Sequence, residues 1–120
     1  MHEFKSYRYL KIAIKNKKYK LYIADTEKKK KIGLSKVKKL LPCFGMIFTY
    51  NKPTNRPFTM KNTSIPLRII FLDASLKILE VYNCRPFQKK LIQPRNSYSY
   101  VIEIWGLYEN QWTRNASTNR

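Results

Sequence analysis

The sequence predicts a mainly β protein of the α+β class, with a compact, barrel-like antiparallel sheet and a short helical insertion around residues 26–41. Two observations support this class. Apolar residues alternate with polar ones in several short segments separated by Asn, Pro and Ser, which is typical of strands. A helical period occurs in one stretch near the N-terminal third. With 120 residues and 43% apolar content, the chain supports one domain, which we expect at residues 1–112, before a polar tail at 113–120.

The segment from Tyr7 to Ile23 is predicted to form a β-hairpin with one face in solvent. Leu10, Ile12 and Ile14 alternate with the polar or small residues between them, as in a strand that buries one side. A turn is expected at residues 16–18, after which the alternation resumes.

A helical segment is predicted after the hairpin. Asp25 or Thr26 can cap its first turn, and a broken apolar stripe continues until Pro42 stops it. Gly33 is expected to divide the segment into two short helices. The four lysines at 28–31 extend around the whole circumference, so they do not form a narrow recognition stripe.

The rest of the chain is predicted to be rich in strands. Residues 69–72 are apolar on both faces, which favours a central strand covered on both sides. The tail after Gln111 has no apolar period, so we expect it to be loose in an isolated monomer. The predicted strands are residues 46–50, 57–60, 67–72, 76–82 and 98–105.

Six short motifs occur in order between about residue 10 and residue 106, and together they resemble the bacterial and organellar domain-of-unknown-function 192 family. The resemblance implies a compact, β-dominated, barrel-like domain with one short helical insertion. It implies no established cofactor or reaction, so it extends to the fold and not to a mechanism. The motifs are Ala24-Asp25-Thr26, Gly33-Leu34, Leu41-Pro42, Gly45-Met46-Ile47-Phe48, Met60-Lys61-Asn62-Thr63 with Ile65-Pro66-Leu67, and Phe71-Leu72-Asp73.

Three departures from the family pattern indicate a derived member. Arg68 stands where the family usually has an acidic residue, so any polar site that used that carboxylate is altered here. Leu76 replaces a turn glycine, so either the turn differs or a left-handed residue is strained by roughly 1–2 kcal/mol. The sequence after Gly106 also lacks the family's usual Gly-Asp ending.

The polar segment at residues 61–64, between two apolar runs, is interpreted as an architectural elbow. Asn62 tolerates a left-handed conformation, and the side chains of residues 62–64 can satisfy nearby backbone amides. Met60 is interpreted as a core residue. Lys61 is the elbow residue that can face a partner.

Catalytic and metal-binding chemistry finds little support in the residue types. The one histidine, His2, lies too near the chain start to be held precisely, and with Cys43 and Cys84 it gives three zinc ligands where about four are needed. We predict no metal, no cofactor and no enzymatic activity. The two cysteines are expected to be thiols in a reducing compartment.

A carboxylate-based enzyme remains the least favoured alternative. Asp25 and Asp73 are at family-matched positions, but a helix cap and a turn residue explain them better. Glu80 and Glu103 lie in predicted strands, where they could pair with neighbouring Lys or Arg side chains.

The net charge of +18, from 25 Lys and Arg against 7 Asp and Glu, is the main functional signal. An anionic partner, such as nucleic acid, a membrane surface or an acidic protein, would relieve the self-repulsion of such a surface. Residues with AT-rich codons also outnumber Gly, Ala, Arg and Pro, so mutational bias in an AT-rich genome explains part of the charge. The alternative of a merely solvated basic surface therefore stays open.

The candidate partner-binding residues are all basic. No recognised nucleic-acid motif accompanies them, so binding to RNA or DNA would be directed to the backbone and sensitive to salt. The candidates are Lys28, Lys29, Lys30, Lys31, Lys36, Lys38, Lys39, Lys61, Arg68, Lys89, Lys90 and Arg95.

These observations favour a non-catalytic accessory or scaffold subunit that binds acidic protein surfaces in a large assembly. A plastid photosynthetic or ribosomal complex is the favoured setting, with a location in the plastid stroma. The alternatives are a sequence-nonspecific RNA- or DNA-binding protein and a phage or viral virion component in a host cytoplasm. We predict no transmembrane span and no secretory signal, while peripheral association with a membrane remains open.

Overall fold

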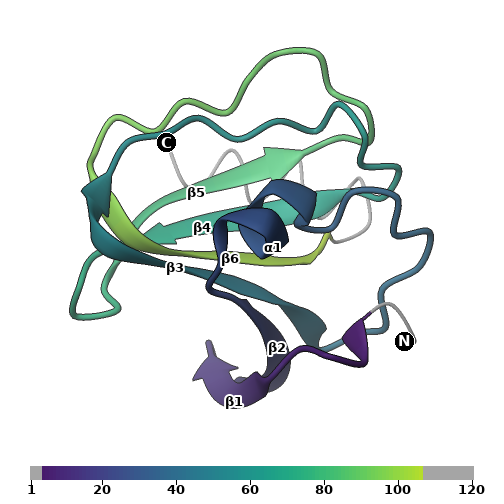
Figure 1. Cartoon of the computed structure of the whole chain (residues 1–120), viewed down its shortest axis with the longest axis horizontal. Helices are drawn as coiled ribbons and strands as arrows, with labels where there is room; N and C mark the ends of the chain where they lie inside the picture. The colour runs from purple at the N-terminus through teal and green to yellow at the C-terminus, as the bar shows by residue number, and fades with distance from the viewer. Residues whose placement is uncertain (1–3, 107–120) are drawn as a thin grey trace.

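A computed structural model describes residues 4–106 of the chain (Figure 1), so the predicted tail at 113–120 lies outside the described residues. Their strands form one sheet in the order β1-β2-β3-β6-β4-β5. In this range, the chain has no helix of the length and apolar character that crossing a bilayer requires. The elements are β1 (Tyr9–Ile14), β2 (Lys17–Ala24), α1 (Glu27–Ile32), β3 (Phe44–Thr54), β4 (Leu67–Leu72), β5 (Ile78–Cys84) and β6 (Tyr98–Trp105).

The mainly β class is confirmed, but the sheet is not closed into a barrel. β1 and β5 are the two edges of the strand order and do not pair with each other. The predicted antiparallel pairing holds for four of the five strand pairs, and the exception is β2 and β3, which pair in parallel with Leu21 opposite Gly45. Two parallel neighbours need a crossover connection, which here contains α1.

The bounds of two central strands are predicted correctly, whereas β3 is longer than the strand predicted at 46–50. The predicted strands at 67–72 and 98–105 coincide with β4 and β6. The predicted strand at 57–60 is wrong, because Phe58 forms only an isolated bridge with Ile92 through two backbone hydrogen bonds of 2.9 Å. Pro57 has no N–H to donate, and the Met60 carbonyl accepts from Thr63 N in a turn.

The predicted hairpin forms with its turn one residue earlier than expected. Lys15 and Asn16 have φ values of 48° and 71°, and Ile14 pairs with Lys17. Two central residues with positive φ are the mark of a type I′ turn, whose twist matches that of the paired strands.

The helical segment is shorter than predicted. Thr26 is the N-cap, and its Oγ1 accepts a 3.1 Å hydrogen bond from Lys29 N, whereas Asp25 pairs with Arg8. Gly33 ends the helix with φ 50°, and its N–H donates to the Lys29 carbonyl. The predicted second helix is absent at residues 34–41, where the chain follows the surface of the sheet and buries side chains at irregular intervals: Leu34, Val37 and Leu40.

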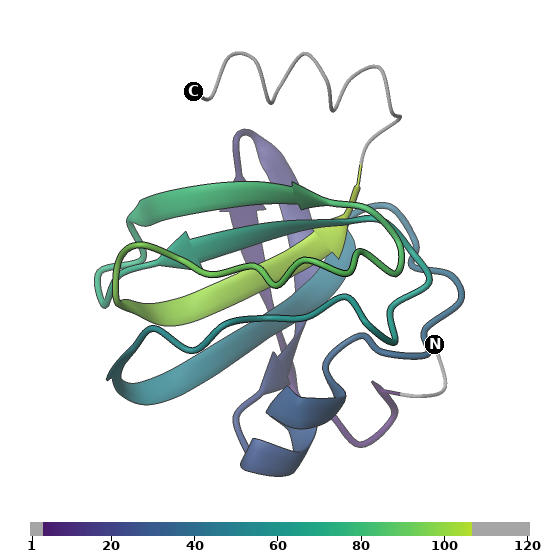
Figure 2. The same ribbon diagram turned by 90° about the horizontal axis from the view of Figure 1, so that it is seen from above.

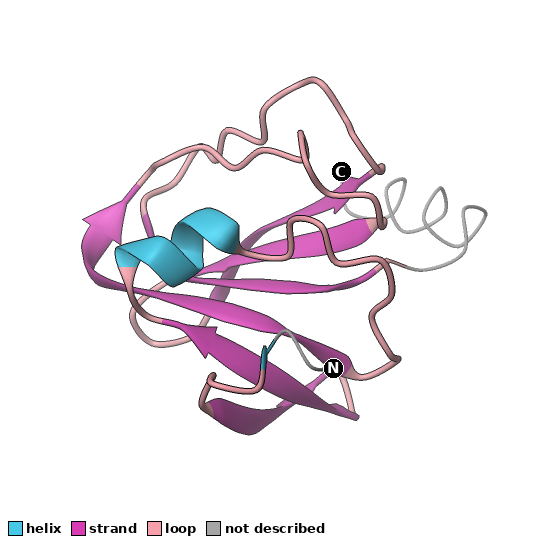
Figure 3. Ribbon diagram, turned by 45° about the vertical axis from the view of Figure 1, so that its right-hand side comes forward, coloured by secondary structure: helices cyan, strands magenta, loops and turns pink. Residues whose placement is uncertain are grey.

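The sheet is covered on both faces, as the apolar run at 69–72 predicts. The larger cluster includes Phe48, Leu67 and Phe71, and the segment with α1 crosses over the sheet in Figure 3. The smaller cluster includes Ile70 and Ile102. Figure 2 shows the β1–β2 hairpin turned away from the direction of β4 and β5, and partly buried residues of this hairpin pack against the smaller cluster.

The turn between β4 and β5 contains Leu76, for which the sequence predicted either a different turn or a strained left-handed residue. The structure shows the left-handed residue. Leu76 has φ 66°, a left-handed conformation that an L-amino acid with a Cβ adopts at a cost. Asp73 Oδ1 accepts hydrogen bonds of 2.9 Å from both Ser75 N and Lys77 N. Asp73 is therefore a turn residue, as predicted.

Candidate functional site

The elbow at residues 61–64 is the point where three loops meet. Asn62 O accepts a hydrogen bond from Lys36 N, and Thr63 O accepts one from Phe87 N, both at 2.9 Å. Ser64 Oγ donates to the Val37 carbonyl at 3.2 Å. The architectural role of the elbow is therefore supported, but it joins loops instead of satisfying nearby amides with its side chains.

Two residues beside this junction refine the sequence interpretation. Met60 is fully buried in the larger core cluster, as predicted. Asn62 is not among the residues with positive φ, so the left-handed conformation considered for it is wrong. Lys61 is exposed beside the elbow residues whose backbone carbonyls bond to the neighbouring loops.

This junction brings together several of the predicted partner-binding lysines. Lys36, Lys38 and Lys39 belong to the loop that bonds to the elbow from one side, and residues 89–90 belong to the loop that bonds to it through Phe87. All of these lysines are exposed, and none forms an ion pair within the described residues. We call this set the elbow lysines: Lys36, Lys38, Lys39, Lys61, Lys89 and Lys90.

The other predicted residues lie on α1, on β4 and in the loop before β6, and Lys28 and Lys29 of α1 line one pocket together with Lys36. Lys28 and Lys31 are exposed on α1, while Lys29 and Lys30 are half-buried there. Arg95 lies in the loop before β6, where its backbone N–H donates to Glu80.

Arg68 is half-buried in β4, on the sheet face opposite to that of Leu67. Its Nε donates to Asn83 Oδ1 at 3.2 Å, and its Nη2 is buried without a hydrogen-bond partner among the described residues. Burial lowers the pKa of the guanidinium below its usual value. Arg68 therefore does not belong to the exposed surface that the sequence analysis assigned to it.

None of the acidic side chains of the described residues forms an ion pair with an elbow lysine, and Asp25 and Glu80 are engaged elsewhere. Asp25 accepts from Arg8 at 2.6 Å, and this hydrogen bond holds the pKa of its carboxyl below the usual value. Burial alone would raise the pKa of Glu80, but hydrogen bonds from Tyr82 and from two backbone N–H groups outweigh it and lower the pKa. The predicted pairing of Glu80 with a basic side chain is wrong, since it bonds the backbone of residues 95–96 instead.

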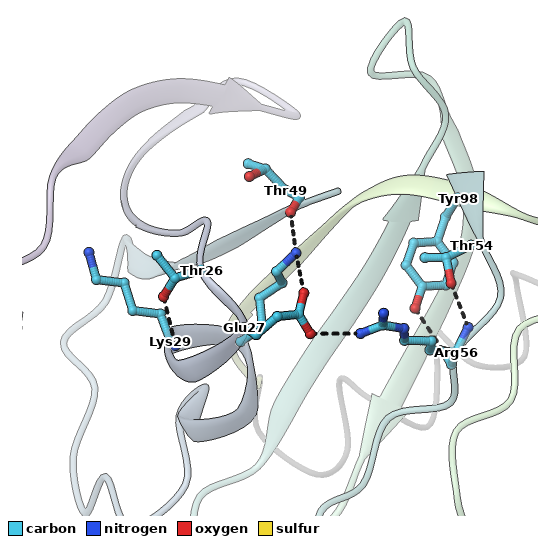
Figure 4. Close-up of polar contacts among 8 residues, drawn as sticks. Thr26, Glu27, Lys29, Thr49, Thr54, Arg56 and Tyr98 are labelled. Atoms are coloured by element: carbon cyan, nitrogen blue, oxygen red, sulfur yellow. Dashed lines mark hydrogen bonds and ion pairs between the residues drawn. The ribbon is translucent and has the colours of Figure 1, made fainter. Parts of the chain in front are cut away.

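A second group of polar residues lies between α1 and the sheet (Figure 4). Glu27 faces Arg56, with 3.1 Å between carboxylate oxygen and Nη1, and Lys30 Nζ lies 3.4 Å from the same carboxylate. Hydrogen bonds from Arg56 and then Lys30 lower the pKa of Glu27. Lys30 also donates to the Thr49 carbonyl and lies 4.1 Å from the centre of the Tyr50 ring.

Glu103 lines the same region from β6 and is the functional candidate that the sequence analysis misjudged. Its side chain is 5% exposed, and no hydrogen bond or ion pair reaches its carboxyl from the described part of the chain, so the predicted pairing with Lys or Arg is wrong. Burial raises its pKa from 4.5 to about 8. The sequence does contain an indication of this burial. Glu103 is two positions after Val101 in a strand, so both side chains lie on the same face of the sheet, and Val101 belongs to the core.

The cysteines remain separate. Cys43 is exposed, Cys84 is buried, and both are free thiols, as expected. Burial raises the pKa of Cys84 to about 12, with a further contribution from Glu103. Within residues 4–106, no three His, Cys, Asp or Glu side chains gather closely enough to hold a metal ion.

Comparison with known proteins identifies one family and two solved structures with a similar fold. A family model, DUF192, described as "Uncharacterized ACR", matches residues 10–112. No curated protein matches the chain. A solved protein of unknown function from Novosphingobium aromaticivorans DSM 12444 is 25% identical, with a TM-score of 0.73 over 88% of this chain and 77% of the other. A protein from Sinorhizobium meliloti 1021, described as a putative transcription regulator, is 23% identical, with a TM-score of 0.70 over 88% and 82%, and shows the shared fold alone.

Proposed function

Since the chain belongs to the domain-of-unknown-function 192 family, which is described as uncharacterized, we propose its function from its surface chemistry. It is a non-catalytic accessory subunit that binds an acidic protein surface within a larger assembly. The observation that carries this proposal is the set of elbow lysines, which are exposed and have no acidic partner within the described residues.

Electrostatics supports this function because the lysines come from loops that the elbow holds in place. Hydrogen bonds at Asn62 and Thr63 fix the two flanking loops against the elbow, so their backbones are already ordered before a partner arrives. Less conformational entropy is then lost on binding than with a free basic tail. Complementary charge across an interface increases the association rate and selects an acidic partner over a basic one.

The setting of this assembly is part of the proposal and rests on composition. The AT-biased residue usage, together with the charge, supports a plastid photosynthetic or ribosomal complex, and a virion is the alternative setting with the same bias. Nucleic acid is the competing partner, since a backbone-directed contact would use the same exposed lysines.

A native pull-down of the full chain, with and without nuclease and followed by mass spectrometry, tests the proposal. We expect an acidic protein complex to co-purify after nuclease treatment and to dissociate as salt concentration rises. Loss of the partner on nuclease treatment would favour nucleic acid instead. Recovery of the chain alone and monomeric would refute the accessory role.

A matched pair of variants locates the contact. One replaces Lys36, Lys38, Lys39 and Lys61 with Gln, and the other makes the same change in charge on the β1–β2 hairpin, at Lys11, Lys15, Lys17 and Lys18, which are also exposed. We expect the first variant to lose the partner and the second to keep it. Equal loss in both would show that net charge alone determines binding.

A further inference from the structure

A cavity of about 470 Å³ lies between α1, residues 55–63 and the sheet. Pockets of this size bind small organic molecules in other proteins. Aromatic side chains on the sheet side and in the 55–63 segment, those of Phe48, Tyr50 and Phe58, contribute to its lining. None of the elbow lysines is among its lining residues, although Asn62 and Thr63 of the elbow are.

The Glu103 carboxyl lines this cavity without a partner from the described residues. Its oxygens are not among the described atoms that are both fully buried and unpartnered, so they open onto the cavity, where a carboxyl group without a protein hydrogen bond takes water or a ligand as its partner. A side chain with a strongly shifted pKa at the wall of a cavity is a common feature of ligand sites. Glu103 therefore marks the polar point that a ligand in this cavity would meet.

The charges around Glu103 favour a negatively charged ligand. The β4 residues on this side of the sheet are apolar. On β5, a charge on Glu103 would raise the pKa of the Cys84 thiol. Lys30 and Arg56 share Glu27 as their ion-pair partner, which leaves a net positive charge, and Lys31 has no ion-pair partner among the described residues. The titratable and charged groups lining the cavity with Glu103 are Glu27, Lys30, Lys31, Tyr50 and Arg56.

We propose that this cavity binds a small organic anion with a planar, hydrogen-bonding ring, whose edge the Glu103 carboxyl recognises while Lys31 and Arg56 attract its negative group. Burial keeps the carboxyl largely uncharged at neutral pH, since its pKa is raised to about 8. An uncharged carboxyl donates through O–H and accepts through C=O, which matches the paired acceptor and donor of a heterocyclic edge. The side chains of Phe48 and Phe58 supply the apolar surface that such a ring needs.

Calorimetric titration of the full chain with adenosine 5′-monophosphate tests this site, with adenosine, inorganic phosphate and benzylamine as comparison probes. We expect saturable binding of the nucleotide and weaker binding of the probes that lack either the ring or the negative charge. Glu103→Gln retains a donor and an acceptor and should bind, whereas Glu103→Leu should bind about tenfold more weakly or not at all. Nucleotide affinity should fall above pH 8 in the wild type and stay constant in Glu103→Gln.

Matched lysine variants separate the site from general charge. Lys31→Ala should weaken nucleotide binding, and Lys11→Ala, which removes the same charge from the exposed side of the β1–β2 hairpin, should leave it unchanged. Urea unfolding shows whether each variant is folded. The proposal is overturned if the wild type does not bind the nucleotide, if folded Glu103→Leu binds as the wild type does, or if benzylamine binds best.

Discussion

Replacing Glu103 with Gln should remove a pH-dependent penalty from the folded state. The side chain is 5% exposed, and burial raises its pKa from 4.5 to about 8. Below pH 4.5 the carboxyl is protonated in both folded and unfolded chains, so it contributes no difference. Between these two values the unfolded chain releases the proton that the folded chain retains, so rising pH favours unfolding through this group.

The size of the effect follows from the shift. One pKa unit corresponds to about 1.4 kcal/mol, so a rise from 4.5 to about 8 amounts to about 5 kcal/mol as an upper limit above pH 8. We expect Glu103→Gln to match the wild type in unfolding free energy at pH 4.5 and to exceed it progressively toward pH 8.5. Urea denaturation of both proteins at several pH values measures this difference, in which the titration of all other groups cancels.

Glu80 provides the control with the opposite sign. Its pKa is lowered in the folded state, because hydrogen bonds from Tyr82 and the backbone of residues 95–96 outweigh the effect of burial. Its contribution to stability is present above the unfolded pKa and is lost as pH falls, so Glu80→Gln should destabilise the protein at neutral pH and less so in acid. A wild-type minus Glu103→Gln difference that stays constant from pH 4.5 to 8.5 would refute the account of Glu103 as a buried, unpartnered carboxyl.

Two further substitutions test the backbone. Leu76→Gly should stabilise the protein by about 1 kcal/mol in urea denaturation. Leu76 has φ 66° and is 45% exposed, so the change relieves backbone strain and loses little burial. A variant less stable than the wild type would show that this turn is unstrained. Gly45→Ala should destabilise the protein by about 1–3 kcal/mol or more in the same assay, because an added Cβ would lie 2.3 Å from the Glu103 carbonyl oxygen. A variant as stable as the wild type would show that β3 and β6 can separate at this point.

The strands at the centre of the sheet could be predicted from local pattern because both of their faces are covered. β4 is apolar at nearly every position, and its predicted bounds at 67–72 agree with the structure. The predicted strand at 57–60 has similar composition, yet it forms one bridge, at Phe58. Composition measures how well a residue suits a half-buried strand, while pairing also depends on a partner strand and on available N–H groups.

The site was less predictable because burial of a polar group depends on distant segments. Glu103 follows the ordinary alternation of β6, and nothing beside it in the sequence indicates that α1 and residues 55–63 would cover it. Arg68 was placed on the surface by its charge, but the neighbouring strand provides Asn83 and buries part of its guanidinium. In both cases the environment comes from residues far away in the chain.

The sequence by itself determined the mainly β class, the family, the positions of β4 and β6, and the basic surface charge, because each follows from local pattern, motif order or composition. Tertiary structure alone decided that the sheet stays open with one parallel pair, that the elbow joins the lysine-bearing loops, and that Glu103 lines a cavity. The physical reason is that strand order and desolvation arise from contacts between segments remote in sequence, whereas alternation and charge are properties of neighbouring residues.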